Sequence, residues 1–183
     1  DYAHFVGGES YLERTWALSA LAHAGRFDAA YAAELARKPQ FLRLEGKAQV
    51  LLAFSRSPDA KSEVSRGMAN ALWDGVVFRS REGKPVYGGL QDGDRLGDLL
   101  LLCSEDRTLA EVLRALQRVA PEDPRLAALV NGLVIRGRGD GWGTTNANAE
   151  ALLALSDVLK SGRFEPFTCT VKEGATSHPL ASA

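Results

Sequence analysis

The stretch GDGWGTTNANAEALLALSDVL, residues 139–159, constrains the fold more than any other part of this sequence. Its first half is a turn rich in glycine, which lacks a Cβ and lets the chain bend sharply. We expect Trp142 to fold back from this turn, next to Gly143, as a hydrophobic plug between helix ends. The hydroxyl of Thr144 or Thr145 is a suitable N-cap for the helix that follows.

The second half of the stretch predicts a helix from about 145 to 160 that is apolar on several faces. Its alanines let neighbouring helices approach closely. Because a helix that is hydrophobic all round is normally buried, we expect it to be an inner helix of a double-layered ring.

Helical patterns dominate the rest of the chain. A capping box at Ser10 and Glu13 opens the first helix, and Gly25 is a typical C-cap residue. The remaining helices are expected at about 27–37, 40–55, 58–72, 93–104, 108–119 and 124–137. A capping box at Thr108 and Glu111 marks the start of the helix at 108–119. Pro58 and Pro124 are typical first residues of a helix, and each follows a residue suited to the N-cap, Ser57 and Asp123.

Two segments interrupt the helical pattern. Residues 76–89 alternate weakly around central turn residues, which predicts a small β-hairpin. Residues 164–171 place apolar side chains on one face at period two, which predicts a short strand. The tail EGATSHPLASA is expected to be disordered.

A short motif recurs along the chain, with a small or β-branched residue, Leu, any residue, Ala and a large apolar residue. It appears as ALSAL, VLLAF, VLRAL and ALLAL. Helical hairpins that cannot bury their faces alone stack on one another. The sequence therefore predicts an all-α fold in which such hairpins form a solenoid or a closed ring.

Composition narrows the functional classes. At 183 residues the chain is one domain, with at most a small appendage, and its formal net charge is −1. This charge gives no reason to expect a nucleic-acid partner. No apolar run is long enough to cross a bilayer, and the absence of an initiator Met suggests a piece of a longer protein. Two cysteines, Cys103 and Cys169, are too few for a disulfide framework, and whether they are bonded is open.

The segment RLAALVNGLVIRGRGDGWGTTNANAEALLALSDVL resembles the end of the thioester-containing helical domain of bacterial α2-macroglobulins, which are protease-trapping proteins. Trp142, Gly143, Thr144 and Thr145 match the family's Trp-Gly-Ser/Thr-Thr run. RTWALSALAHAG, GDRLGDLLLLCSED and PEDPRL resemble further segments in the same order, so that the likeness covers about 9–160. Asn146 and Glu150 depart from it, since the family commonly has Gln and an aromatic residue there.

The resemblance implies an all-α fold, an α/α toroid segment of stacked helical hairpins. Residues 1–162 would form the later part of the toroid, and 163–183 would lead to a following β domain. It also implies a non-catalytic scaffold of a protease trap that is periplasmic or extracellular. The expected partners are proteases, met through the full-length protein, and neighbouring domains of the same chain. Exposed ring edges predict a dimer.

The family's reactive element is Cys-x-Glu-Gln, in which the Cys thiol and the Gln side chain form an internal thioester. Cys103-Ser104-Glu105-Asp106 does not match, because Asp106 has no amide to lose and its side chain is one methylene short. Whether the longer protein carries the thioester elsewhere is open. We expect no catalytic residue, no cofactor and no metal site in these 183 residues.

Two alternatives remain. A helical-repeat module could bind protein partners on a concave face. A toroid enzyme of the terpene-cyclase or prenyltransferase class would need an Asp-rich motif or a zinc triad. The three histidines, His4, His23 and His178, are scattered and show no metal-ligand spacing. The pairs Arg95 with Asp98 and Arg114 with Arg118 are interpreted as solvated helix faces.

Overall fold

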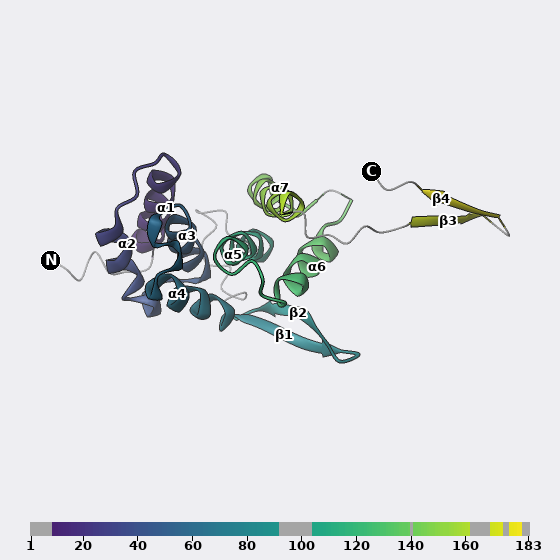
Figure 1. Ribbon diagram of the computed structural model, residues 1–183, viewed down its shortest axis with the longest axis horizontal. Coiled ribbons are helices and arrows are strands. Elements are labelled where there is room, and N and C mark those ends of the chain that lie inside the picture. The colour runs from purple at the N-terminus through teal and green to yellow at the C-terminus, as the bar shows by residue number, and fades with distance from the viewer. Residues whose placement is uncertain (1–8, 92–103, 140, 162–168, 174–175, 181–183) are drawn as a thin grey trace.

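The computed structural model describes residues 9–91, 104–139, 141–161, 169–173 and 176–180. These residues are mostly helical, with two small antiparallel hairpins (Figure 1). The α-helices are α1 (Glu9–His23), α2 (Ala29–Ala36), α3 (Leu44–Phe54), α4 (Glu63–Trp73), α5 (Glu105–Val119), α6 (Leu126–Arg136) and α7 (Thr145–Lys160). Short 3-10 turns are η2 (Pro39–Phe41) and η3 (Pro58–Lys61), and the strands are β1 (Val76–Arg81), β2 (Lys84–Leu90), β3 (Cys169–Glu173) and β4 (Thr176–Leu180).

The helices pack in two rows. In the first row α1 packs on α3, α3 on α5 and α5 on α7. In the second row α2 lies on α3, α4 on α3 and α5, and α6 on α5. Helices α1, α3 and α5 are thus each followed along the chain by a helix of the second row, as in a stack of helical hairpins. The stacking predicted from the repeated motif is therefore visible, whereas closure into a toroid stays a prediction.

Contacts between helix ends fix the direction of the first row. The Thr108 hydroxyl, near the start of α5, donates to the Glu45 carboxylate near the start of α3 at 2.8 Å. The Arg118 guanidinium, in the last turn of α5, donates to Asp157 near the end of α7 at 2.8 Å. Helices α3, α5 and α7 therefore run in the same direction.

The core lies between the two rows. Helix α5 is its centre, because Leu109, Val112, Leu113 and Leu116 have no exposed surface. Burial of large aliphatic side chains contributes most of the stability of such a fold, at roughly 25 cal/mol per Å² of apolar surface.

The predicted hairpin is confirmed as β1 and β2, which pair antiparallel with an irregularity between Val77 and Phe78. Its turn residues Glu82 and Gly83 have φ of +53° and +76°, as a tight two-residue hairpin turn requires. The hairpin packs on α6, and Figure 1 shows it on the side of α5 opposite to α7. At the contact the Tyr87 ring lies against Gly132, where an added Cβ would come within 2.6 Å of the Tyr87 Cβ.

The expectation for the C-terminus was wrong in part. The predicted strand at 164–171 is observed only from Cys169, and 164–168 lie outside the described residues. The tail was expected to be disordered, but Thr176–Leu180 forms β4 and pairs antiparallel with β3. The polar sequence of the tail has no apolar alternation that would predict a strand. Its strand is instead formed by backbone pairing with β3. The predicted domain division after residue 162 stays a prediction.

Four predicted helix starts need correction. The helix expected from about 40 begins at Leu44, after the separate 3-10 turn η2. Pro58 opens η3, and α4 begins at Glu63, where the Ser62 hydroxyl accepts from the backbone N–H of Ser65. Helix α5 begins at Glu105, one turn before the predicted capping box. Helix α6 begins at Leu126, because Asp123 accepts the backbone N–H of Arg125 in a turn before the helix. The helix predicted at 93–104 lies outside the described residues except for its last residue.

Helix α7 has the predicted bounds, but the prediction that it is buried on all sides is wrong. Its buried residues Ala147, Ala151, Ala154 and Val158 form one row that faces the core, which we call the alanine face. On other faces Leu152 and Leu159 are 61% and 67% exposed. Among the described residues the helix has a neighbour in the first row on one side only, which is α5.

Candidate functional site

The Trp142 turn connects α6 to α7 and is stabilised by four polar contacts. The backbone N–H of Arg138 donates to the Gly141 carbonyl, and the Gly141 N–H donates back to Arg138. The Trp142 backbone N–H donates to Asn148 Oδ1 at 2.6 Å. Its indole Nε1 donates to the Leu133 carbonyl of α6 at 2.8 Å. The turn is thereby tied to the helix before it and to the helix after it.

The glycines of the turn are required by its backbone. Gly141 and Gly143 have φ of +90° and +86°, a region that other residues rarely adopt. The Thr144 hydroxyl accepts the backbone N–H of Ala147 at 3.1 Å and is the N-cap of α7. Thr145 is instead the first helical residue and is exposed. Of the two predicted caps, Thr144 therefore has this role.

Trp142 is half-buried and packs against the core, as predicted for a plug between helix ends. Its neighbour Asn148 was not identified from the sequence, although an Asn one turn into a helix is well placed to accept from the preceding loop. Of the four residues of the predicted motif, Trp142, Gly143 and Thr144 thus shape the turn or cap the helix after it, whereas Thr145 is the exposed first residue of α7.

A cleft lies on the face of the first row that is turned away from the second. Every helix of that row contributes to it, and its lining includes Trp16 of α1, Gln49 of α3, Arg107 and Arg114 of α5 and Leu153 of α7. Its volume is about 460 Å³. Because α1 and α7 are the two ends of the row yet line the same cleft, the row is concave on this face.

The walls of the cleft carry ion pairs between α5 and α7. Arg114 Nη1 lies 2.5 Å from Glu150 Oε2, and its Nε lies 3.8 Å from Asp157 Oδ2. Arg118 shares the Asp157 carboxylate. The interpretation of Arg114 and Arg118 as solvated helix faces is therefore wrong, because both bridge two helices, and the Arg114 side chain is only 14% exposed. Glu150, which departs from the family pattern, is one of the bridging acids.

The most unusual titratable group is Glu111 on α5, which has no exposed surface. Burial raises the pKa of the Glu111 carboxyl to about 8 and outweighs the opposing attraction of Arg107. Arg107 Nε lies 3.1 Å from Glu111 Oε1, and Gln49 forms a side-chain hydrogen bond with the same carboxyl. The Arg107 guanidinium also stacks over the Trp16 ring at 4.4 Å. These contacts connect α1, α3 and α5 beneath the cleft.

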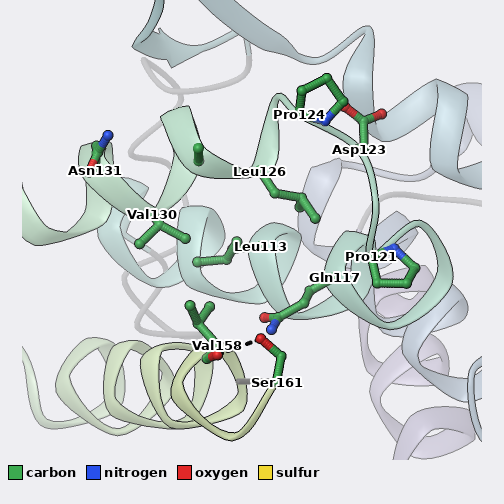
Figure 2. Close-up of a pocket in the computed structure, with 11 residues that line it drawn as sticks. Leu113, Gln117, Pro121, Asp123, Pro124, Leu126, Val130, Asn131, Val158 and Ser161 are labelled. Carbon is green, nitrogen blue, oxygen red and sulfur yellow. Dashed lines mark hydrogen bonds between the residues drawn. The ribbon is translucent and has the colours of Figure 1, made fainter. Parts of the chain in front are cut away.

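A second, apolar pocket of about 270 Å³ lies between α5, α6 and α7. Figure 2 shows Leu113, Val130 and Val158 around it, one from each of these helices. Ser161 also lines the pocket, and its hydroxyl donates to the Val158 carbonyl at 2.6 Å. The residues that line this pocket do not place an acid, a base and a nucleophile together as a catalytic site would require.

The other candidate residues are dispersed. His23 is exposed in the last turn of α1, His178 lies in β4, and His4 lies outside the described residues. Cys169 begins β3, while Cys103, Arg95 and Asp98 lie outside the described residues. Within the parts of the chain that the structure describes, no group of three His, Cys, Asp or Glu side chains could hold a metal ion. No helix there is long and apolar enough to cross a membrane.

Comparison with known proteins gives no relative. No family of known sequences, no curated protein and no solved structure matches this chain.

Proposed function

We propose that this chain is a non-catalytic scaffold segment of a protease trap similar to the bacterial α2-macroglobulins. The observation that carries the proposal is that the Trp142 turn and the two-row stack of helices are both features that the resemblance to this family implies. Among the residues that carry the resemblance, Trp142 to Thr145, Trp142 connects α6 to α7 and Thr144 caps α7. The stack of α1, α3, α5 and α7 is the architecture expected for part of an α/α toroid.

In this role the concave face of the first row would be the inner surface of the toroid. The ion pairs of Arg114 and Arg118 and the buried Glu111 hold three neighbouring helices of that surface in a fixed arrangement. The scaffold would contain and position a reactive or bait element that belongs to another part of a longer protein. Such a protein would act in the periplasm or outside the cell, and its targets would be proteases.

The test is mass spectrometry of the full-length gene product after exposure to an active protease. The proposal predicts a complex that contains both proteins, covalent if the protein has a thioester and non-covalent if it does not. A protease inactivated at its nucleophile is the control, because without cleavage no complex should form. Full-length protein that the protease has demonstrably cleaved, but that holds no protease, would contradict the proposal.

A second candidate function is a helical-repeat module that binds a protein partner on its concave face. The cleft favours this candidate, because it is open and combines an aromatic residue, Trp16, with polar groups such as Gln49 and Arg107. The two candidates differ in their response to Leu153→Glu, a change at the cleft wall that leaves the Trp142 turn intact. Partner binding by a module would be lost, whereas protease retention by a trap would be kept.

A further inference from the structure

The apolar pocket between α5, α6 and α7 has the size of a site for a small molecule. Its volume is about 270 Å³, whereas an apolar cavity of about 150 Å³ in another protein is large enough to bind benzene. Among the residues that the structure describes, none lines both this pocket and the concave cleft. A molecule in the pocket would therefore bind without contacting the residues of the cleft.

The walls of the pocket select a ligand with an apolar body. Its most buried lining residues are Leu113, Leu126 and Val158, which come from the three surrounding helices. Pro121 and Pro124, in the loop between α5 and α6, add apolar surface of fixed backbone shape. Because removal of apolar surface from water is favourable, an aromatic or branched aliphatic group would bind against these side chains.

One buried polar atom of the lining has no hydrogen bond. Gln117 Oε1 is buried and has no partner among the described residues. Figure 2 shows its side chain extending from α5 toward Ser161, just after the end of α7. A buried carbonyl oxygen without a partner is unfavourable, because it has lost its hydrogen bonds to water. The terminal torsion of glutamine is broad, so the amide can rotate to accept a hydrogen bond from a ligand N–H or O–H.

The charges at the pocket disfavour an ionised ligand. None of the described residues that line it is Lys, Arg or His. Hydrogen bonds from Arg125 lower the pKa of the Asp123 carboxyl, which lines the pocket and is therefore ionised near neutral pH. Both Asp123 oxygens already accept from Arg125. An anion would meet this carboxylate without a cation in the lining, and a cation would compete with Arg125 for it.

We propose that this pocket binds a small neutral molecule that has an apolar body and an N–H or O–H group, which donates to Gln117 Oε1. Neutral aromatic heterocycles and phenols have this chemistry. Because such a molecule would contact α5, α6 and α7 together, and only in the folded state, its binding would also stabilise the fold. The inference does not rest on the proposed function, since a chain that binds no such molecule would still be able to serve as a scaffold of a protease trap.

Two probes of nearly the same shape test the proposal on the 183-residue chain. Indole has an N–H where benzofuran has an ether oxygen, so only indole can donate to Gln117. In NMR titrations both probes should shift backbone amide signals of α5, α6 and α7, and indole should bind about tenfold more tightly. Indole-3-carboxylate keeps the N–H but adds a negative charge, and it should not bind.

Substitutions identify the pocket and the acceptor. Gln117→Met keeps the length of the side chain but removes the amide, and should bind indole and benzofuran with equal affinity. Gln40→Met, an exposed change on η2, is the matched control and should keep the preference for indole. Val158→Phe fills the pocket and should abolish the binding of both probes. Val130→Phe is a second change of this kind, and circular dichroism checks that each variant keeps its helical content.

Three results would overturn the proposal. The first is a wild-type chain that binds neither indole nor benzofuran, because the pocket would then not accept an apolar molecule. The second is equal affinity of the wild-type chain for both probes, because Gln117 would then not be the acceptor. The third is binding that persists unchanged in both Val158→Phe and Val130→Phe, because the probes would then occupy another part of the molecule.

Discussion

The indole Nε1 of Trp142 lies 2.8 Å from the carbonyl oxygen of Leu133, nine residues earlier in the chain. Leu133 is fully buried in α6, so this hydrogen bond connects the glycine turn directly to the core. The backbone N–H of the same tryptophan binds Asn148 of α7. A single residue therefore sets the angle at which α7 leaves α6 and reaches α5.

Two substitutions of Trp142 should lower the free energy of unfolding by different amounts. Trp142→Phe keeps an aromatic ring but loses the indole N–H and its hydrogen bond, which should cost about 1 kcal/mol of unfolding free energy. Trp142→Ala also loses the packing and should cost roughly 3 kcal/mol. Urea unfolding followed by circular dichroism measures both. Trp16→Phe is the matched control, because the Trp16 indole N–H has no hydrogen-bond partner among the described residues, and a loss as large as that of Trp142→Phe would contradict this account.

The two adjacent threonines should differ in their effect on stability. Thr144→Ala removes the N-cap of α7 and should lower the free energy of unfolding by about 1 kcal/mol. Thr145→Ala changes an exposed first-turn residue and should be close to neutral. Equal effects in denaturant unfolding would show that Thr144 is not the cap.

Two helical glycines should respond to alanine with opposite signs. Gly67 on α4 has nothing within 4 Å of an added Cβ, so Gly67→Ala should stabilise the protein by up to about 1 kcal/mol through helix propensity. At Gly132 the same Cβ would approach the Tyr87 ring atoms to 2.7 Å and displace the hairpin. Gly132→Ala should therefore lower the melting temperature, and a rise would mean that the hairpin does not rest on α6.

The buried Glu111 should make stability depend on pH. The pKa of its carboxyl is raised to about 8 in the folded protein, whereas in the unfolded chain it is near the ordinary 4.5. Between these values the folded state holds a proton that the unfolded state has lost, so stability should fall as pH rises from about 5 to about 8. Glu111→Gln stays neutral and should flatten this part of the melting-temperature profile.

Glu34→Gln, an exposed change on α2, is the control for this experiment and should keep the wild-type profile. A wild-type melting temperature that rises steadily from pH 5 to 8, and is unaffected by Glu111→Gln, would contradict the assignment.

Capping and turn residues in the sequence predict those helices and strands whose ends are determined by neighbouring residues. The bounds of α7 follow from Thr144, and the β1–β2 hairpin follows from its turn residues. The start of α5 was misplaced because Thr108 and Glu111 have the spacing of a capping box. Residues three apart also share one face of a helix interior, and here Thr108 binds Glu45 while Glu111 is buried.

Features that depend on contacts between distant parts of the chain could not be predicted from local sequence patterns. The composition of α7 is equally consistent with burial on all sides and with one buried face, and only the position of α5 decides between them. Arg114 and Glu150 are 36 residues apart, so their ion pair depends on the way α5 and α7 pack. The cleft likewise needs four helices to be placed before any of its lining residues can be grouped.

Retention of protease activity tests the central claim most directly. The full-length gene product is mixed with an active protease and separated by gel filtration, and each fraction is assayed with a small peptide substrate. If the chain belongs to a protease trap, peptide-cleaving activity elutes with the full-length protein and disappears from the position of the free protease. If all activity elutes at the free position after the protein has been cleaved, the chain is not part of a trap.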